Sequence, residues 1–544
     1  MARGGERGDR ALTQRQVLAD RFSQVPWRRA VRQAFRSLSG RGAAVLPERL
    51  EGAVYGHLVG DALGVPYESS RPGAIGEVDW CGGGAHGQPP GTWSDDGALM
   101  LALLDSLLSA GFDLDDQGRR ALAWRDEGRY APGGTVFDIG EATSAALGRI
   151  AAGTPAAAAG RIEAKGNGSL MRILPLPLVL RDADPGDLAD MAARASRVTH
   201  GSAEAQLACA LYALVARRLL EGERDRRRAL AVARRELRAV VAARGMPGSP
   251  EAAEQAAAVE ALDAFEAWPG RSGGGRVVDS LWSAWDAFAG SSGYRETIVR
   301  AVSLGNDTDT TAAVAGGLAG AYWGVGSIPP EWRRGLRDPE IPRGLVDRLV
   351  ATAPGGWDGK PWRTSTGNPL RVDVLDLAGI GAAAGVTIGI TFLPGRRYVG
   401  YHTGAHWRSL DADAARLREL GVDVLLLLVE DAELERCRVT EVGDVLPDHG
   451  VDLVRFPIRD PLVPRDGPAF RLVIAGLLER VRAGESLAIA CRAGLDRSGL
   501  AAGCLLREAD LDADDAIGRV QRARRGALTL PDGQAYVRAW PPRT

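Results

Sequence analysis

Two short segments of the chain each place two carboxylates and a hydroxyl where an apolar helix is expected to begin. Residues 94–96 read Ser-Asp-Asp and precede a leucine-rich stretch with helical spacing at 98–108. Residues 307–310 read Asp-Thr-Asp-Thr and precede the small, apolar and proline-free stretch 311–323. Aspartate, serine and threonine at a helix start also cap free backbone N–H groups and complement the helix dipole. Capping can therefore explain each cluster by itself.

The alternative interpretation is that the fold brings both clusters together around a metal ion. The four aspartates at 95, 96, 307 and 309 would then repel one another and would not stay ionised without a compensating cation. Oxygen ligands without histidine or cysteine select a hard cation such as Mg²⁺ or Mn²⁺. The spacing alone leaves both interpretations open.

A different chemistry is indicated where a strand pattern ends at Cys491 and a helical pattern follows Arg497. A loop of this length can wrap a phosphate with consecutive backbone N–H groups that close onto a helix N-terminus. The same groups favour a nucleophilic thiolate at Cys491, and Arg497 can fork onto two phosphate oxygens. Ser498 can hydrogen-bond to the thiolate and help it leave. The residues expected to line the phosphate are Arg492, Ala493, Gly494, Leu495 and Asp496.

The bulk properties indicate a soluble protein with two or three domains. The chain has 544 residues, is 45% hydrophobic and 25% charged, and has a net charge of −2. This balance predicts neither a membrane partner nor sequence-specific nucleic acid binding. Five scattered cysteines and an arginine-rich N-terminus without an apolar segment fit a cytoplasmic, bacterial protein. The apolar run at 377–393 is too short and too rich in glycine for a membrane span, and is expected to be a loop that enters a buried strand.

The pattern of apolar residues along the sequence changes near residue 353. We expect an arginine-rich extension over 1–45, an all-α domain over 46–352, a linker over 353–374 and an α/β domain over 375–544. In the last part, short apolar runs alternate with helical stretches, which predicts a parallel sheet. The expected strands are 422–429, 451–458 and 486–491, and the expected helices are 412–420, 467–482 and 498–507.

Five ordered motifs of the first part resemble the ADP-ribosylglycohydrolase family over roughly 47–350. They include the two acidic clusters and "PERLEGAVYGHLVGDALGVPYES" at 47–69, which has Gly52, Gly56 and Gly60 on one helical face. The others are "GNGSLMRILPL", which begins at Gly166, and "THGSAEA" at 199–205.

The resemblance implies a hydrolase with a pair of Mg²⁺ or Mn²⁺ ions. Its substrate would be ADP-ribose attached to a protein, a nucleic acid or a small molecule, and water would attack an oxocarbenium-like anomeric carbon. Asp309 or Asp96 would accept the proton of that water, and Glu68 would lie near the metal site. The metal ligands implied by the resemblance are Ser94, Asp95, Asp96, Asp307, Asp309 and Thr310.

The same resemblance implies residues that line the ADP-ribose cleft. Asp138 matches a carboxylate of a site loop, and Asn167, Gly168 and Met171 match a glycine-rich turn. His200 would stack on or hydrogen-bond to the ligand, although a buried packing role is an equal alternative. Two positions depart from the family pattern: Ser94 stands where threonine is commoner, and Gly97 stands where a hydroxyl residue is usual.

The second part resembles the dual-specificity and tyrosine phosphatase superfamily, in particular the branch of cyclin-dependent-kinase inhibitor 3, over about 375–540. Beside the Cys-x5-Arg loop, the resemblance is carried by "TFLPGRR", "VRFPIRDPLVP" and "RRGALTLPDGQAYV". It implies that Cys491 attacks a phosphorylated substrate and that Asp460 protonates the leaving oxygen. Ala490 replaces the usual histidine before the cysteine, and Asp496 stands where a small residue is usual.

The sequence thus predicts a metal-dependent ADP-ribosylglycohydrolase fused to a cysteine-dependent phosphatase-like domain. In the alternative hypothesis, the phosphatase-like domain is catalytically weak. It would then act as a module that binds phosphate or ADP-ribose and targets the glycohydrolase. A purely structural protein is disfavoured because all the candidate metal ligands are present.

Overall fold

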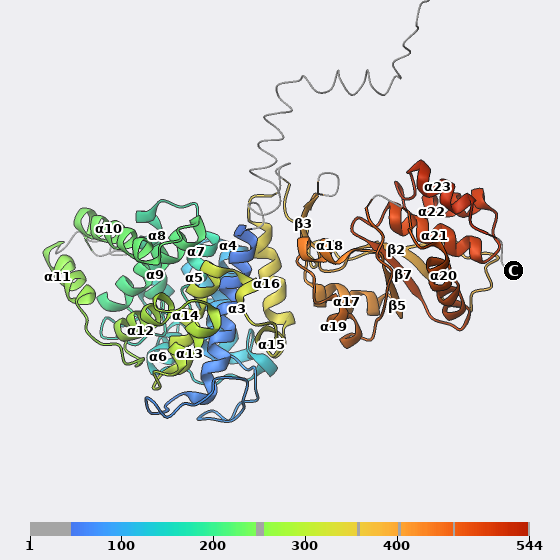
Figure 1. Ribbon diagram of the computed structural model, residues 1–544. Helices are drawn as coiled ribbons and strands as arrows, with labels where there is room; N and C mark the ends of the chain where they lie inside the picture. The colour runs from blue at the N-terminus through green and yellow to red at the C-terminus, as the bar shows by residue number, and fades with distance from the viewer. Residues whose placement is uncertain (1–44, 246–254, 356–359, 401–403, 461–462, 542–544) are drawn as a thin grey trace, which may run out of the picture.

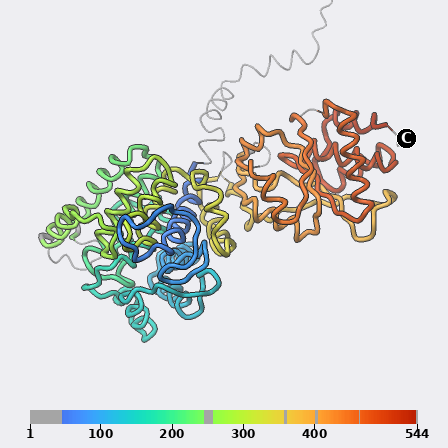
Figure 2. Tube along the Cα trace, turned by 60° about the horizontal axis from the view of Figure 1, so that its bottom comes forward, coloured from blue at the N-terminus to red at the C-terminus, as the bar shows by residue number. Residues whose placement is uncertain are grey.

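The computed structural model describes residues 45–245, 255–355, 360–400, 404–460 and 463–541. Within these ranges the chain forms two lobes, which Figures 1 and 2 show from two sides. The first lobe is helical and the second combines helices with a sheet. The N-terminal extension expected at 1–45 lies, except for its last residue, outside the described residues.

The first lobe confirms the prediction of an all-α region. Both expected helices at the acidic clusters are present, as α4 and α14. Its α-helices are α3 Val45–Gly64, α4 Asp95–Ala110, α5 Leu114–Glu127, α6 Glu141–Ala151, α7 Pro175–Val179, α8 Pro185–Ser196, α9 Ala203–Glu221, α10 Arg226–Arg244, α11 Gln255–Glu266, α12 Val277–Ala289, α13 Tyr294–Val302, α14 Thr308–Trp323, α15 Pro330–Arg334 and α16 Glu340–Ala351.

Helices α3 and α14 run antiparallel at a distance that only glycine permits. A Cβ atom on Gly56 would lie 2.4 Å from the carbonyl oxygen of Gly316, and one on Gly320 would lie 1.8 Å from that of Gly52. The glycine face that the sequence indicates on α3 is therefore a contact between two helix backbones. Figure 1 shows the two helices in the middle of the first lobe.

This contact brings the end of α3 to the start of α14. The hydroxyl of Thr308 donates a hydrogen bond of 2.8 Å to the carbonyl oxygen of Gly64. A Cβ atom on Gly64 would lie 2.4 Å from the Cα atom of Asp309. The backbone at the second acidic cluster is thus held directly against the end of α3.

The second lobe contains a five-stranded mixed sheet in the order β1-β2-β7-β5-β6. The predicted parallel sheet is present in β2, β7, β5 and β6, and β1 adds an antiparallel edge to β2. Alternate residues of β5 enter separate hydrophobic clusters on the two faces of the sheet. The strands are β1 Asp373–Val374, β2 Ile388–Phe392, β5 Val424–Leu427, β6 Asp452–Arg455 and β7 Leu487–Cys491, with a separate hairpin of β3 Arg397–Gly400 and β4 Gly404–Trp407.

Helices cover both faces of this sheet (Figure 1). One hydrophobic cluster contains residues of α20 to α23, and the other contains residues of α17 to α19. The predicted helices at 412–420, 467–482 and 498–507 correspond to α17, α20 and α21. The helix bounds are α17 Leu410–Glu419, α18 Asp431–Arg436, α19 Val442–Asp448, α20 Gly467–Arg482, α21 Asp496–Glu508, α22 Ala513–Ala523 and α23 Pro531–Arg538.

The β3–β4 hairpin packs on the first lobe. The buried carboxylate of Glu51 in α3 accepts hydrogen bonds from Arg397 Nη2 (2.8 Å) and Trp407 Nε1 (2.6 Å). The Trp407 ring also meets the buried ring of Trp362 edge-on, with ring centroids 5.9 Å apart. Trp362 belongs to the segment expected to be a linker, so the described part of that segment is packed between the lobes.

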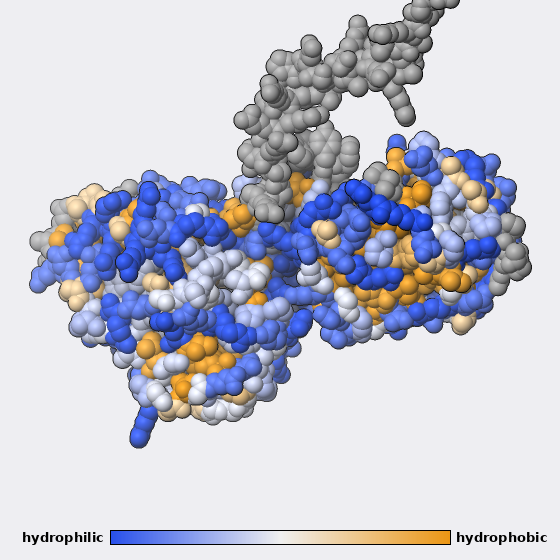
Figure 3. All heavy atoms as spheres, in the orientation of Figure 1, coloured by the Kyte–Doolittle hydropathy of each residue, from blue (hydrophilic) through white to orange (hydrophobic). Residues whose placement is uncertain are grey.

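The surface in Figure 3 is largely hydrophilic, with limited apolar patches on each lobe. Among the described residues, the large hydrophobic side chains that are exposed are Ile162, Val374 and Leu472. No helix in the described ranges is both long and apolar enough to cross a membrane. The apolar run at 377–393 enters the buried strand β2, as the sequence predicts.

The contact between α3 and α14 leads to a stability prediction. We expect Gly316→Ala to lower the free energy of unfolding by about 1–3 kcal/mol or more, because the new methyl group would overlap the Gly56 carbonyl. Thermal melting of the full chain measures the effect. The matched control is Gly148→Ala in α6, where nothing lies within 4 Å of the new Cβ atom. An equal melting temperature for both variants would contradict the close contact.

Candidate active sites

The first acidic cluster lies on a turn whose backbone amides are hydrogen-bonded to a side chain of α3, that of Asp61. Ser94 caps α4, since its hydroxyl accepts the amide of Asp96 at 3.2 Å. The buried carboxylate of Asp61 accepts the amides of Ser94 (3.0 Å) and Gly97 (2.7 Å). Serine supplies the cap, and neither Asp95 nor Asp96 is needed for it.

The second cluster also contains a carboxylate that does not cap its helix. Asp307 occupies the N-cap position of α14, but its side chain makes no capping hydrogen bond. Instead, Asp307 Oδ2 accepts a hydrogen bond of 2.8 Å from Asn167 Nδ2. The two clusters meet where Thr310 Oγ1 donates to Asp96 Oδ2 at 3.2 Å. The capping interpretation therefore does not account for Asp307.

The buried carboxylates of this centre lack a compensating positive charge among the described residues. Burial raises the pKa values of Asp95, Asp96 and Asp309 well above the usual range, and repulsion from the neighbouring carboxylates of the centre raises them further. Asp96 Oδ1 and Asp309 Oδ2 are buried without a hydrogen-bond partner in the described structure. Oxygen donors with unused lone pairs and unfavourable mutual repulsion fit a hard divalent cation.

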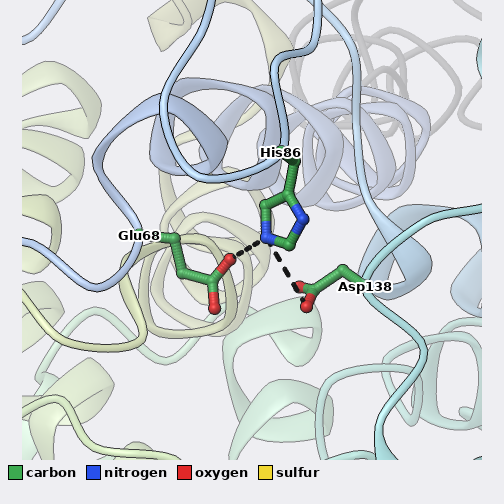
Figure 4. Close-up of side chains that lie close together, drawn as sticks. All are labelled: Glu68, His86 and Asp138. Carbon is green, nitrogen blue, oxygen red and sulfur yellow. Dashed lines mark hydrogen bonds and ion pairs between the residues drawn. The ribbon is translucent and has the colours of Figure 1, made fainter.

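A histidine joins two carboxylates at the rim of the same centre. His86 Nε2 contacts Glu68 Oε2 and lies 3.6 Å from Asp138 Oδ1 (Figure 4). Burial, followed by repulsion from Glu68, raises the pKa of Asp138 to about 6. Repulsion from the Asp138 carboxylate in turn raises the pKa of Asp95, after the larger effect of burial. The rim is thus continuous with the buried acidic cluster.

In the second lobe, the loop after β7 folds around the cysteine side chain. The amide of Gly494 donates to Cys491 Sγ at 3.2 Å, and Ser498 Oγ lies 3.4 Å from the same sulfur. Gly494 adopts a φ of 70°, and a Cβ atom there would lie 2.5 Å from the carbonyl oxygen of Thr391. The loop therefore presents a backbone N–H and a hydroxyl to the sulfur, as a thiolate nucleophile requires.

Arg497 is held from behind by a buried glutamate. Its Nη1 and Nη2 atoms bond to the two carboxylate oxygens of Glu433 at 2.6 and 3.0 Å, and both side chains are almost fully buried. Nη1 also donates to the carbonyl oxygens of Leu428 and Ile458. Arg497 Nε is buried with no hydrogen-bond partner among the described residues. Nε instead lies 3.5 Å from Asp460 Oδ1, so this edge of the guanidinium faces the carboxylate that is the candidate acid.

Two further arginines organise the surroundings of the loop. Arg396 Nη1 donates to the backbone carbonyl of Arg492 at 2.6 Å, and its Nη2 contacts His406. Arg492 Nη2 bonds to Asp460 Oδ2 at 2.7 Å, which places that carboxylate over the loop. Ala490, at the position where the family has histidine, is a buried strand residue. Arg396 therefore supplies a loop-bracing contact from another segment.

The carboxylate of Asp496 interacts with a neighbouring loop. Its Oδ1 accepts the amide of Thr529 at 3.1 Å and the hydroxyl of the same residue at 3.3 Å. This arrangement gives the aspartate a structural function as an anchor for the segment that follows α22.

Comparison with known proteins assigns both parts of the chain. Residues 43–358, more than half of the chain, match the ADP-ribosylglycohydrolase family model. The chain belongs to the ADP-ribosylglycohydrolase family. Residues 359–518 match the model of the cyclin-dependent kinase inhibitor 3 family, so the second part is phosphatase-like.

Relatives of this glycohydrolase cover its first lobe. The ADP-ribosylarginine hydrolase Tri1 of Pseudomonas putida is 31% identical over 59% of this chain and 83% of its own length. The ADP-ribosyl-[dinitrogen reductase] glycohydrolase of Rhodospirillum rubrum is 29% identical over 56% and 97%, respectively. A solved structure named ADP-ribosylglycohydrolase-related protein complex is 38% identical over 56% of this chain and 97% of that chain, with a TM-score of 0.44.

The residues predicted to line the glycohydrolase cleft divide into exposed and buried groups. Glu68, Asp138 and Asn167 lie around the acidic centre. Met171 is buried in the core and His200 is 2% exposed. His200 lies beneath the glycine-rich turn, because a Cβ atom on Gly168 would meet its ring at 2.8 Å. Burial lowers the pKa of His200 to about 4, so its neutral ring favours the packing alternative.

Sequence reasoning missed several supporting residues. Asp61 was part of a recognised motif, but only its contacts with the Ser94 turn reveal its positioning role. His86, Glu433 and Arg396 lie far in sequence from the groups that they contact, and no local spacing marked them. The departure at Gly97 also has a local cause, since a Cβ atom there would lie 2.7 Å from the Trp93 ring.

The raised pKa values lead to a prediction about stability and pH. Asp138 and Asp61 have pKa values of about 6 and about 7 in the folded chain, raised mainly by burial. Unfolded aspartate titrates near pH 4, so their contribution to stability is present below about pH 4 and is lost as pH rises through 6 to 7. Without divalent cations, the melting temperature should fall over this range.

Mg²⁺ should reverse that loss. At about 100 times its dissociation constant, a cation that binds only the folded state adds about 2.7 kcal/mol. The increase in melting temperature should therefore be larger at about pH 8 than at about pH 5, where the carboxyls retain protons. Melting curves with Mg²⁺ or with chelator measure it. Equal responses at both pH values would contradict a cation at this centre.

Proposed function

We propose that the first lobe removes ADP-ribose from a modified side chain with a divalent metal centre, Mg²⁺ or Mn²⁺. The observation that supports this most directly is the set of buried, mutually repelling oxygen donors. The residues proposed to hold the metal are Ser94, Asp95, Asp96, Asp307, Asp309 and Thr310. A divalent cation there would supply Lewis-acid polarisation of bound oxygen atoms.

The chain's own groups would perform the remaining steps. Asp309 or Asp96 would accept a proton from the water that attacks the anomeric carbon, since each has a buried oxygen without a hydrogen-bond partner among the described residues. The bond between that carbon and the side chain breaks, and the leaving group keeps the electron pair and takes up a proton. The amide of Gly168 would face the diphosphate, since that of Asn167 donates to the carbonyl oxygen of Gly275.

The linkage that we propose to test first is the one to arginine. Two relatives are named as ADP-ribosylarginine hydrolases. Mass spectrometry of arginine- and serine-linked ADP-ribosyl peptides, incubated with the protein and Mg²⁺, would compare the two linkages.

We further propose that the second lobe, within the predicted boundaries 375–544, hydrolyses phosphomonoesters in the cytoplasm. Cys491 Sγ would attack phosphorus, and Asp460 would protonate the leaving oxygen. Water would then cleave the phosphocysteine. The Gly494 amide and the Ser498 hydroxyl beside Cys491 Sγ support an anion site at this loop. The second candidate is a phosphate-binding module without turnover, which the salt bridge between Asp460 and Arg492 would favour if it holds the acid away from substrate.

The glycohydrolase proposal predicts a strict metal requirement. We expect chelation to abolish ADP-ribose release and Asp309→Asn to lower kcat/KM by about 100-fold or more, because a ligand and candidate base is lost. Release of ADP-ribose measured by chromatography is the readout. Asp126→Asn, at a surface ion pair in α5, is the matched control. Full activity in excess chelator would exclude the proposal.

The phosphatase proposal predicts that substitutions within one loop lower the rate of phosphate release by very different factors. Cys491→Ser and Arg497→Lys should nearly abolish phosphate release from an aryl phosphate, since the nucleophile or the guanidinium fork is lost. Asp496→Gly should change the rate less than about tenfold, because its carboxylate faces Thr529. A large gain from Asp496→Gly, or no turnover by the parent protein, would favour the binding module. Melting curves verify that each variant is folded.

A further inference from the structure

At the rim of the acidic centre, the imidazole of His86 lies beside two carboxylates. Glu68, His86 and Asp138 each direct one ligand atom toward the others, and all three atoms lie within 4.8 Å of one another. Figure 4 shows the imidazole edge between the two carboxylates. These side chains are 19–26% exposed, so water can complete a coordination sphere.

The arrangement is supported from two directions. The His86 ring packs against Phe137, with ring centroids 5.3 Å apart, and Phe137 directly precedes Asp138. The loop that contains His86 is closed by a bridge between Gly83 and Gln88, and Gln88 Nε2 donates to the His86 carbonyl oxygen at 3.1 Å. The chain thus orients the imidazole and one carboxylate through the same segment.

The three ligand atoms are close enough to one another to share one ion after small side-chain shifts. A cation about 2.1 Å from each ligand separates neighbouring ligand atoms by about 3 Å and opposite ones by about 4.2 Å. His86 Nε2 and Asp138 Oδ1 are 3.6 Å apart, whereas His86 Nε2 and Glu68 Oε2 are in direct contact and would have to move apart to bind the same ion. Only small side-chain shifts would bring all three into coordination distance.

We propose that Glu68, His86 and Asp138 form a separate metal subsite that binds a first-row transition cation such as Mn²⁺. One imidazole and two carboxylates differ from the all-oxygen donors of the buried cluster, and imidazole favours transition metals over Mg²⁺. The subsite goes beyond the proposed hydrolysis, since it requires only metal binding. Its consequence is a centre that takes Mg²⁺ or Mn²⁺ inside and prefers Mn²⁺ at the rim.

The competing explanation is that a charged His86 serves as a counter-ion for the two carboxylates. A salt bridge of this kind would keep nitrogen away from any cation. The two explanations therefore differ in whether a bound metal has an imidazole nitrogen as ligand, which pulsed electron paramagnetic resonance detects directly as ¹⁴N modulation of the Mn²⁺ signal.

The experiment uses the metal-free full chain loaded with Mn²⁺ alone. We expect ¹⁴N modulation in the parent protein and its loss in His86→Gln. The matched control, His449→Gln, changes a partly exposed histidine of the second lobe and should keep the modulation. Excess Mg²⁺ should displace the Mn²⁺ that is bound by oxygen ligands alone. The Mn²⁺ that is bound by the His86 nitrogen, called the nitrogen-coupled population, should stay bound.

Each outcome decides the proposal. No modulation in the parent protein, or modulation that persists in folded His86→Gln, would overturn it. If His86→Gln does not fold, Glu68→Gln and Asp138→Asn provide the test, because each should weaken Mn²⁺ binding of the nitrogen-coupled population by about tenfold or more. Unchanged Mn²⁺ binding in both would overturn the subsite. ADP-ribose release is not part of the readout, so failure of the subsite and failure of the proposed function are distinguishable.

Discussion

The backbone contact between α3 and α14 is the constraint on which the first lobe depends. Gly52, Gly56 and Gly64 let the two helices touch along most of their length, so the end of α3 meets the start of α14. Asp61 then reaches the Ser94 turn from α3, and Asp309 stands at the start of α14. Side chains in that contact would separate the two acidic turns, and the shared cluster of carboxylates would not exist.

The carboxylates themselves oppose this arrangement. Their burial and mutual repulsion disfavour the ionised forms, which raises the pKa values of Asp95, Asp96 and Asp309. A fold that tolerates this cost in the absence of a positive side chain suits a bound cation, whose charge converts repulsion into attraction. The local strength of helix packing therefore allows an arrangement that electrostatics alone would reject.

The second lobe buries a positive charge where the first lobe buries negative ones, because the Arg497 guanidinium lies in the loop that follows the Cys491 thiol. Glu433 neutralises Arg497 from behind, and Arg497 Nε lies 3.5 Å from Asp460 Oδ1. Two consecutive residues then connect the lobes: Arg396 braces the phosphate loop, and Arg397 bonds to Glu51 of α3. The loop and the helix that supports the acidic centre are thus linked through one short segment, although the two chemistries are different.

The sequence alone determined the main helices and strands and the families of the two parts. Periodicity located α4, α14 and the strands at β5, β6 and β7, because local pattern and burial agree there. The ordered motifs indicated both families before any geometry was known. Glycine spacing on α3 also indicated a close contact, although not its partner.

Only the tertiary structure decided which groups meet across long sequence distances. It placed His86 between Glu68 and Asp138, paired Glu433 with Arg497, and packed the expected linker through Trp362. It also showed that the Asp307 carboxylate bonds to Asn167 and does not cap its own helix. Such contacts depend on how helices and strands pack, and local propensity does not encode that packing.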